Sequence, residues 1–225
     1  MKFPRKAGEG LEAPAVTKIL INQIMREGKF ITIYGINNIG KTTQAHLLVD
    51  RLKDEGYKSY YVKYPVYDVE PSGSFINDIL RGREEQKISE DELQMWYVIN
   101  RYQFQPKLIN LLEEGYVVIA EDYAGTGIAW GTAKGLEEEW VETINSKVLK
   151  EDLAILMEGK RQMDAVEEKH VHEQNKELIE KCEKIHSHLA EKYDWKRVKV
   201  QKKIEGTAEN LWKIVKKSLV DVPKK

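Results

Sequence analysis

Short apolar runs alternate along this chain with longer stretches in which apolar residues recur at helical spacing. Runs of this length that are rich in Val, Ile and Tyr favour β-strands. Two of them, Tyr116–Ala120 and Leu153–Met157, are almost wholly apolar, which is typical of parallel strands covered on both faces. The pattern predicts five strands, at Lys29–Tyr34, Tyr57–Tyr64, Tyr116–Ala120, Leu153–Met157 and Arg197–Val200.

The stretches between the runs predict helices. In the longest of them, Ser89 and Glu92 form a capping box, Gly115 is a C-terminal stop, and Pro106 predicts a kink. The predicted helices are Gln44–Glu55, Ser74–Arg81, Ser89–Glu114, residues 165–192 and Thr207–Val220.

Strands that alternate with helices predict an α/β fold, a three-layer doubly wound domain around a five-stranded parallel sheet. An amphipathic stretch from Pro14 to about Arg26 precedes the first strand. We therefore expect a helical arm over residues 1–28 and a single domain over residues 29–225.

Composition narrows the classes of partner. The 225 residues suit one domain, and 36 Lys and Arg against 37 Asp and Glu give no electrostatic footprint for DNA or RNA. Cys182 is the single cysteine, so no internal disulfide forms and a reducing compartment fits best. No apolar run reaches membrane-spanning length, and the first residues lack the core of a secretion signal. We expect a soluble cytoplasmic protein with no membrane or nucleic-acid partner.

A phosphate-binding motif follows the first strand. Gly35–Thr43 fits the pattern of Gly, four variable residues, Gly, Lys and Thr, and it lies between a predicted strand and a predicted helix. Backbone N–H groups and the helix N-terminus would surround phosphates there, Lys41 would reach the β- and γ-phosphates, and Thr42 would bind Mg²⁺. The alternative is a chance motif on an ordinary strand–turn–helix. The residues predicted to bind ATP phosphates are Gly35, Asn38, Ile39, Gly40, Lys41, Thr42 and Thr43.

Two carboxylates end the third predicted strand. Ligands bind beyond the carboxyl ends of parallel strands, so Glu121 and Asp122 should lie beside the phosphate loop and hold Mg²⁺ together with Thr42. One of them could also orient an attacking hydroxyl. Alternatively, they cap the segment that follows, and the sequence does not decide which of the two is functional.

Three further features bear on an acceptor. Tyr64 and Pro65 begin a shaped loop, or an ordinary turn, after the second strand. Tyr97 and Arg101 share one helix face, where they either stack a base and clamp a phosphate or serve as core and surface residues. Residues 158–175 predict a mobile basic lid from which Arg161 would neutralise charge during catalysis, and its charges otherwise form a solvated face.

Taken together, these motifs resemble the thymidylate kinase family of P-loop nucleoside monophosphate kinases, from about Lys29 to Val215. The resemblance implies ATP-dependent conversion of dTMP to dTDP with Mg²⁺, in a P-loop kinase fold that is commonly a homodimer. Tyr97 would stack the acceptor base, and Arg101 would contact the acceptor nucleotide. The acceptor-binding residues implied or suggested in this way are Asn37, Lys63, Tyr64, Pro65, Tyr67, Tyr97, Asn100, Arg101, Tyr123, Thr126 and Trp130.

The chain departs from the family pattern at three charged positions. Asp122 stands where the family usually has Arg, Tyr67 where an Arg is frequent, and Asn37 where an Asp is used near the acceptor sugar. Lys63, or an extra Mg²⁺ on Asp122, could restore positive charge. Three hypotheses stay open: a nucleoside monophosphate kinase with dTMP first, a kinase for nucleosides or modified nucleotides, and a non-catalytic nucleotide-binding protein.

Overall fold

The protein folds around one five-stranded sheet in which every strand is parallel to its neighbours, in the order β2-β3-β1-β4-β5. The computed structural model describes residues 26–82, 87–161 and 176–224. The predicted N-terminal arm and most of the predicted lid therefore lie outside the described residues. The strands are β1 (Lys29–Tyr34), β2 (Ser59–Lys63), β3 (Val117–Glu121), β4 (Leu153–Glu158) and β5 (Lys196–Lys199).

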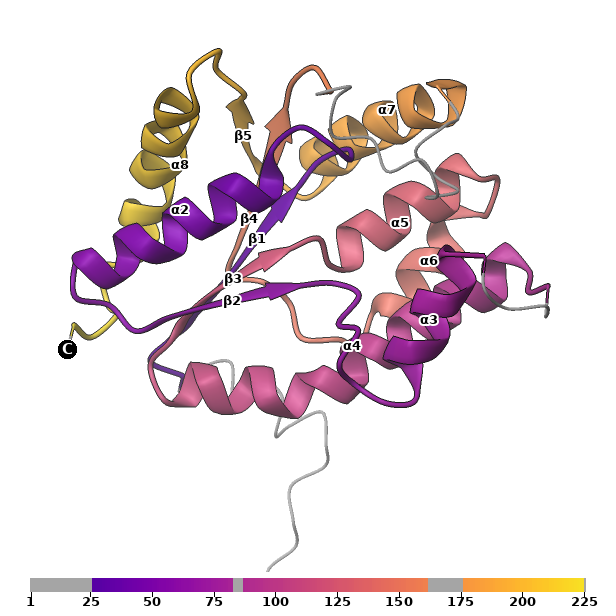
Figure 1. Ribbon diagram of the computed structural model, residues 1–225, viewed down its shortest axis with the longest axis horizontal. Coiled ribbons are helices and arrows are strands. Elements are labelled where there is room, and N and C mark those ends of the chain that lie inside the picture. The colour runs from indigo at the N-terminus through magenta and orange to yellow at the C-terminus, as the bar shows by residue number, and fades with distance from the viewer. Residues whose placement is uncertain (1–25, 83–86, 162–175, 225) are drawn as a thin grey trace, which may run out of the picture.

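Helices cover both faces of the sheet, which confirms the predicted three-layer fold (Figure 1). In Figure 1, α2 and α8 lie together on one side of the sheet and α4 lies on the other. The described helices are α2 (Lys41–Asp54), α3 (Ser72–Leu80), α4 (Glu90–Glu113), α5 (Ala124–Ala133), α6 (Glu138–Asn145), α7 (Lys176–Lys192) and α8 (Ile204–Ser218). Within the described residues, no helix has the length and apolarity needed to cross a bilayer.

The local signals in the longest helix are confirmed at both ends. The Ser89 side chain accepts a hydrogen bond from the Glu92 backbone N–H, and Gly115 follows the helix with a φ of 81°. The helix continues through Pro106 as one element. Its buried side includes Leu108 and Leu112, which pack into the core below β3.

Helices α5 and α6 were not predicted from the sequence. Three glycines lower the intrinsic helix propensity of α5, yet tertiary packing of the segment against α7 and α4 overrides it. One of these glycines permits a close approach, because a Cβ on Gly127 would lie 2.8 Å from Arg101 Nη2. The beginning of α2 was also placed too late, since the helix starts at Lys41, directly after the phosphate loop.

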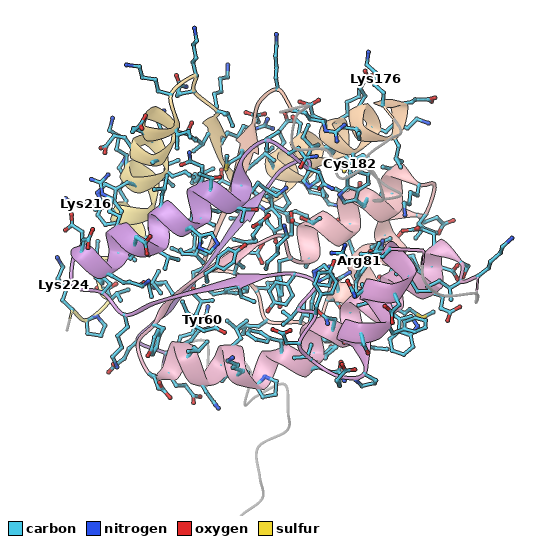
Figure 2. The ribbon with its side chains drawn as sticks, in the orientation of Figure 1. Tyr60, Arg81, Lys176, Cys182, Lys216 and Lys224 are labelled. Atoms are coloured by element: carbon cyan, nitrogen blue, oxygen red, sulfur yellow. The ribbon has the colours of Figure 1, made fainter. Side chains whose placement is uncertain are left out.

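Cys182 is a buried residue of α7 (Figure 2). Its Sγ lies 3.4 Å from Nδ1 of His186, one turn further along the same helix. Burial raises the pKa of the Cys182 thiol well above its ordinary value. This cysteine is therefore an unreactive core residue.

We expect Leu108→Ala to lower the free energy of unfolding by about 2–5 kcal/mol, because it leaves a cavity in a core position with 0% exposure. Chemical denaturation monitored by circular dichroism measures the change. Val220→Ala, at a position with 83% exposure, is the control and should change stability by less than about 0.5 kcal/mol. Equal losses in the two variants would contradict the assigned core.

Candidate active site

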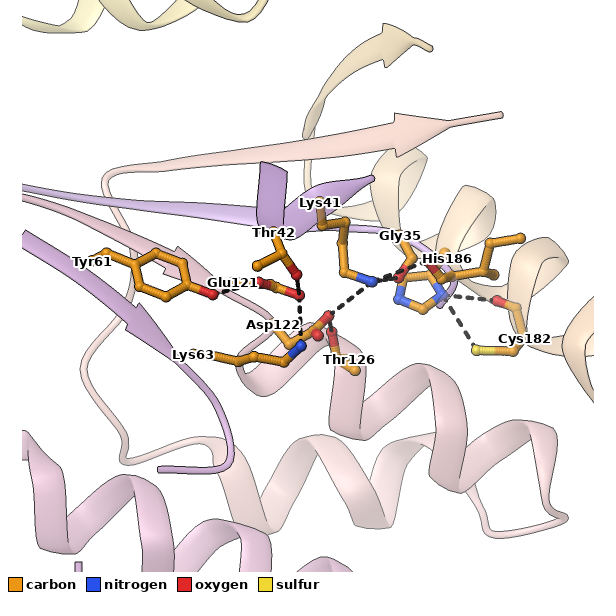
Figure 3. Close-up of polar contacts among 11 residues, drawn as sticks. Gly35, Lys41, Thr42, Tyr61, Lys63, Glu121, Asp122, Thr126, Cys182 and His186 are labelled. Carbon is orange, nitrogen blue, oxygen red and sulfur yellow. Dashed lines mark hydrogen bonds and ion pairs between the residues drawn. The ribbon is translucent and has the colours of Figure 1, made fainter. Parts of the chain in front are cut away.

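The phosphate loop joins β1 to α2 at the carboxyl end of the sheet. Asn38 and Gly40 have φ angles of 64° and 92°, and Gly40 is the residue before the first turn of α2. The buried Lys41 ammonium donates to the carbonyl oxygens of Gly35 and Ile36 at 2.8 and 2.9 Å (Figure 3). The loop thus holds Lys41 at the helix N-terminus, where phosphate oxygens are favoured.

Glu121 is the centre of a hydrogen-bonded cluster beside this loop (Figure 3). Thr42 Oγ1 donates to its Oε1 at 2.9 Å, and Lys63 Nζ lies 3.0 Å from the same oxygen. Tyr61 donates its hydroxyl to Oε2 at 2.6 Å. These partners converge because Tyr61 and Lys63 share one face of β2, and Lys63 is in register with Glu121 on β3.

The cluster keeps Glu121 ionised. Burial alone would raise the pKa of Glu121, but the positive charges of Lys63 and Lys41 and the hydrogen bond from Tyr61 together hold it below its ordinary value. Burial and the same hydrogen bond raise the pKa of Tyr61 well above its ordinary value, so its hydroxyl remains a donor at neutral pH. Glu121 is therefore a fixed carboxylate between Thr42 and Lys63.

Asp122 occupies a different environment. Its φ is 61°, its Oδ1 accepts a hydrogen bond from Thr126 at 2.8 Å, and the same oxygen lies 3.6 Å from Lys41 Nζ. Burial, reinforced by the neighbouring charge of Glu121, raises the pKa of Asp122 above its ordinary value despite Lys41. Neither carboxylate acts as a helix cap, because α5 begins after Tyr123 with no side-chain capping bond.

The donor set fits Mg²⁺ that is shared with a substrate. A threonine hydroxyl and two carboxylates present the hard oxygen atoms that this ion prefers. Among the described residues, no group of three or more His, Cys, Asp or Glu side chains could enclose a metal. Thr42, Glu121 and Asp122 would therefore hold Mg²⁺ together with phosphate oxygens and water, which is the usual way this ion binds.

A cavity of about 530 Å³ runs from the phosphate loop to α4 and α5. Most of the predicted site residues line it, while Gly35, Ile39 and Arg161 are not among its lining residues. Ile39 instead packs its side chain into the core at 1% exposure. The predicted residues that line the cavity are Asn37, Asn38, Gly40, Lys41, Thr42, Thr43, Lys63, Tyr64, Pro65, Tyr67, Tyr97, Asn100, Arg101, Glu121, Asp122, Tyr123, Thr126 and Trp130.

Asn100 and Arg101 are both buried at the wall of this cavity, but their side chains bond to different parts of the protein. Asn100 exchanges two hydrogen bonds of 2.8 Å with the backbone of Val66 and so fixes the loop that follows Pro65. Arg101 donates to Asn145 Oδ1 at 2.8 Å and to the Tyr123 carbonyl oxygen at 2.9 Å. The guanidinium is thereby held rigidly against α5.

Sequence reasoning missed one end of the cavity. Part of this end could have been predicted from helical spacing, because four lining residues share one face of α4. They are Glu90, Gln94, Tyr97 and Arg101. The partner of Glu90, Lys134, comes from the end of α5 and could not be paired with it from spacing alone. The lining residues that were missed are Leu80, Arg81, Glu90, Gln94, Gly127 and Lys134.

A phosphate loop, a carboxylate at the end of the neighbouring strand and an adjoining cavity define a P-loop nucleotide-binding protein. Comparison with known sequences makes the assignment narrower. The sequence profile of the family described as thymidylate kinase matches residues 33–211, so this chain belongs to that family.

Individual relatives agree with this family. The chain is 36% identical over 135 residues to a probable thymidylate kinase of Pyrococcus horikoshii, an alignment of 58% of this chain and 65% of the relative. It is 30% identical over 130 residues to the thymidylate kinase of Schizosaccharomyces pombe, with 58% and 60% covered. The chain thus spans less than two thirds of the length of these curated relatives. A thymidylate kinase structure from Candida albicans superposes with a TM-score of 0.74 at 23% identity, covering 86% of this chain and 92% of that one, which supports the fold.

We expect Tyr61→Phe to raise the pKa of Glu121, because it removes a hydrogen bond that favours the charged carboxylate. Carbon-detected NMR of the carboxyl carbons, assigned with Glu121→Gln, measures this pKa. A depressed folded-state pKa stabilises the protein above the unfolded-state pKa, and this stability is lost as the pH falls through the folded-state value. The variant should therefore lose stability at neutral pH.

Tyr60→Phe is the matched control, since Tyr60, labelled in Figure 2, is the neighbouring residue of the same strand. The Tyr60 ring contacts the Lys107 ammonium instead of Glu121. It should leave the pKa of Glu121 unchanged. An unchanged pKa in Tyr61→Phe as well would mean that the hydroxyl does not support the carboxylate.

Proposed function

We propose that this protein transfers the γ-phosphoryl group of ATP to a nucleoside monophosphate, with dTMP as the preferred acceptor and dTDP as the product. The observation that carries this proposal is the single cavity that joins the phosphate loop to the aromatic and guanidinium groups of α4 and α5. A donor and an acceptor can meet there within one continuous cavity. Family membership supports the same activity.

On the donor side, the residues of the loop would bind and orient the triphosphate. Loop N–H groups would surround the phosphates, and Lys41 would exchange its bonds to the Gly35 and Ile36 carbonyl oxygens for the β- and γ-phosphate oxygens. When bound, Mg²⁺ would neutralise charge on those oxygens. Because phosphoryl transfer depends mainly on positioning and electrostatics, Thr42 and Glu121 would contribute by holding a fixed geometry.

On the acceptor side, rigid groups would position the nucleotide. Tyr97 and Trp130 present aromatic surface to the cavity, which suits stacking of a base. Arg101 is held in place by Asn145 and the Tyr123 backbone. Lys63 is half-exposed at the cavity and would attract the acceptor phosphate while it pairs with Glu121. Arg161 would add positive charge during transfer from the segment after β4.

Asp122 favours a second candidate function, transfer to the hydroxyl group of a nucleoside. A buried carboxylate with a raised pKa lies beside Lys41, where a general base for a hydroxyl would be useful. Its negative charge would oppose an acceptor phosphate unless a proton or a cation neutralised it. Turnover of thymidine without turnover of dTMP would select this candidate.

A homodimer in the cytoplasm is the state we propose for the protein in the cell. Met95, Ile99 and Tyr102 form an apolar stripe along α4, with exposed fractions of 43%, 40% and 41%. Their spacing places them on one side of the helix, which suits packing against the same helix of a second copy. The buried thiol of Cys182 needs no oxidising compartment.

Lys41→Ala should lower the turnover number for phosphoryl transfer by about a thousandfold, because a preorganised charge at the transferring group is lost. The measurement incubates the protein with Mg²⁺ and ATP and a panel of nucleosides and nucleoside monophosphates, and follows ADP and the phosphorylated product. Lys53→Ala, at an exposed lysine of the same helix, is the control and should retain full activity. Retained turnover in Lys41→Ala, or transfer to none of the acceptors by the unmodified protein, would reject the proposed activity.

Ile99→Asp should convert the proposed dimer to a monomer, because it places a charge in the centre of the apolar stripe. Sedimentation equilibrium measures the mass in solution. Glu113→Asp, at an exposed residue near the end of the same helix, should leave the mass unchanged. An unmodified protein that sediments as a monomer of 26.1 kDa would exclude this interface.

A further inference from the structure

The loop between β2 and α3 forms one wall of the cavity, and hydrogen bonds to α4 hold it at both ends. Pro65 and Tyr67 of this loop line the cavity, and Tyr67 is 38% exposed. The start of the loop is held by Asn100, which bonds to the backbone of Val66. The end of the loop is held by Gln103, which lies three residues further along α4 and is not among the lining residues.

Gln103 fixes the end of the loop together with the beginning of α3, which packs beside α4 (Figure 1). Its Nε2 donates to the carbonyl oxygen of Glu70 at 2.6 Å, and its Oε1 accepts from the backbone N–H of Ser72 at 3.3 Å. Ser72 is the first residue of α3, and Pro71 before it provides no side-chain cap. The first N–H groups of a helix lack partners within the helix, so Gln103 supplies from α4 an acceptor that this end needs.

The hydroxyl group of Ser72 connects the two ends of the loop. It accepts a hydrogen bond from Asn100 Nδ2 at 2.9 Å and donates one to Gln103 Oε1. Ser72 and Asn100 are 0% and 1% exposed, so water does not compete for the bond between them. Asn100, Ser72 and Gln103 therefore form one continuous chain of hydrogen bonds, which we call the loop clamp.

Each amide of the loop clamp has a fixed orientation. Asn100 Oδ1 accepts from the Val66 backbone N–H, so Nδ2 must point to the Val66 carbonyl oxygen and the Ser72 hydroxyl. Gln103 Nε2 must point to the Glu70 carbonyl oxygen, because that oxygen can only accept. A buried polar network whose members are all satisfied is rigid, since it cannot rearrange without losing several bonds at once.

The loop also packs closely against the beginning of α3. The Gly73 backbone N–H donates to the Val69 carbonyl oxygen at 2.6 Å, and a Cβ on Gly73 would lie only 2.2 Å from the Tyr67 carbonyl oxygen. At the other end of this helix, Leu80 and the following residue, Arg81, line the cavity. By fixing the first residue of α3, the loop clamp sets the position of the loop and of the helix in relation to the cavity.

We infer that Ser72 and Gln103 are positioning residues for the acceptor, because the loop clamp holds the cavity wall of residues 65–71 in the shape that the acceptor binds. This inference rests on the proposed function, since it assigns that wall to the acceptor. A loop that is ordered before binding adds no ordering cost to binding. The bonds of the loop clamp reach residues 66–72 and not the phosphate loop, so its loss should weaken binding of the acceptor and not of ATP.

The test compares Ser72→Ala and Gln103→Leu with the unmodified protein. Calorimetry measures the dissociation constants of ATP and of thymidine, dTMP and dCMP, each added alone. In both variants the preferred acceptor should bind about tenfold more weakly, and binding of ATP should change by less than about twofold. Gln103 is only partly buried, so Gln103→Leu keeps the test decisive if Ser72→Ala does not fold. Acceptor binding in Gln103→Leu that stays within about twofold of the unmodified protein would overturn the inference.

Hydrogen exchange reports whether the loop is the cause. Mass spectrometry of the free proteins should show exchange over residues 66–71 that is at least about tenfold faster in Gln103→Leu than in the unmodified protein. Weaker acceptor binding without faster exchange in this loop would also overturn the inference, because the loss would then arise elsewhere.

Two matched controls separate positioning from a general loss of stability. Ser74→Ala removes an exposed hydroxyl of the same helix that bonds to the Glu70 side chain, and it should leave binding unchanged. Gln105→Leu removes a glutamine of α4 that accepts from the Leu149 backbone N–H at 2.7 Å. It should lower the melting temperature without weakening the acceptor. Equal losses of acceptor binding in Gln105→Leu and Gln103→Leu would overturn the inference, because both would then act through stability alone.

The outcome stays separable from the proposed activity because binding is measured without phosphoryl transfer. If dTMP is phosphorylated but Gln103→Leu binds it as tightly as the unmodified protein, the inference falls and the activity stands. If an acceptor binds without being phosphorylated and Gln103→Leu weakens it, the inference stands and the proposed activity falls. If none of the three candidate acceptors binds to the unmodified protein, both fall.

Discussion

The buried negative charge of Glu121 is the constraint on which the site depends. A carboxylate with 3% exposure is tolerable only if hydrogen bonds and positive charges replace the lost water. Thr42 comes from the start of α2, Tyr61 and Lys63 come from β2, and Glu121 ends β3. The charge therefore ties the phosphate loop to two strands, and the register of those strands becomes part of the site's geometry.

Two adjacent carboxylates play different parts because their surroundings differ. Glu121 accepts bonds from three groups and stays ionised, whereas Asp122 has Thr126 and a more distant Lys41, and its pKa is raised. Neighbouring groups whose pKa values are pushed apart can serve different purposes in one reaction. The fixed charge of Glu121 suits a residue that orients groups around the donor phosphates. Asp122 has a raised pKa, so its protonation state would decide whether it repels a negatively charged acceptor.

The parts of the site that lie close to a recognisable local pattern could be predicted from the sequence. The phosphate loop is contiguous, and the carboxyl ends of parallel strands must meet at one edge, so Lys41, Thr42 and Glu121 could be placed together before the fold was known. The sheet, the long α4 and its cap followed from periodicity and capping signals.

The remainder depends on contacts between distant segments. The glycines of α5 oppose a helix locally, and only packing against α4 and α7 decides its conformation. Arg101 of α4 bonds to Asn145 of α6, and Gln94 of α4 lies next to Gly127 of α5. These residues are too far apart in the sequence for their spacing to predict the contacts. Asn100 lines the cavity as the sequence suggested, and its amide also bonds to the backbone of Val66, a contact between distant segments that the sequence did not indicate.

We propose that one cavity binds the phosphoryl donor and the nucleotide acceptor at the same time. The most direct test is the dissociation constant of a conjugate in which adenosine and thymidine are joined through a chain of phosphates, measured by calorimetry in the presence of Mg²⁺. If both halves bind at once, the conjugate should bind at least about a hundredfold more tightly than either ATP or dTMP. A conjugate that binds no more tightly than ATP alone would mean that the two halves do not share this cavity.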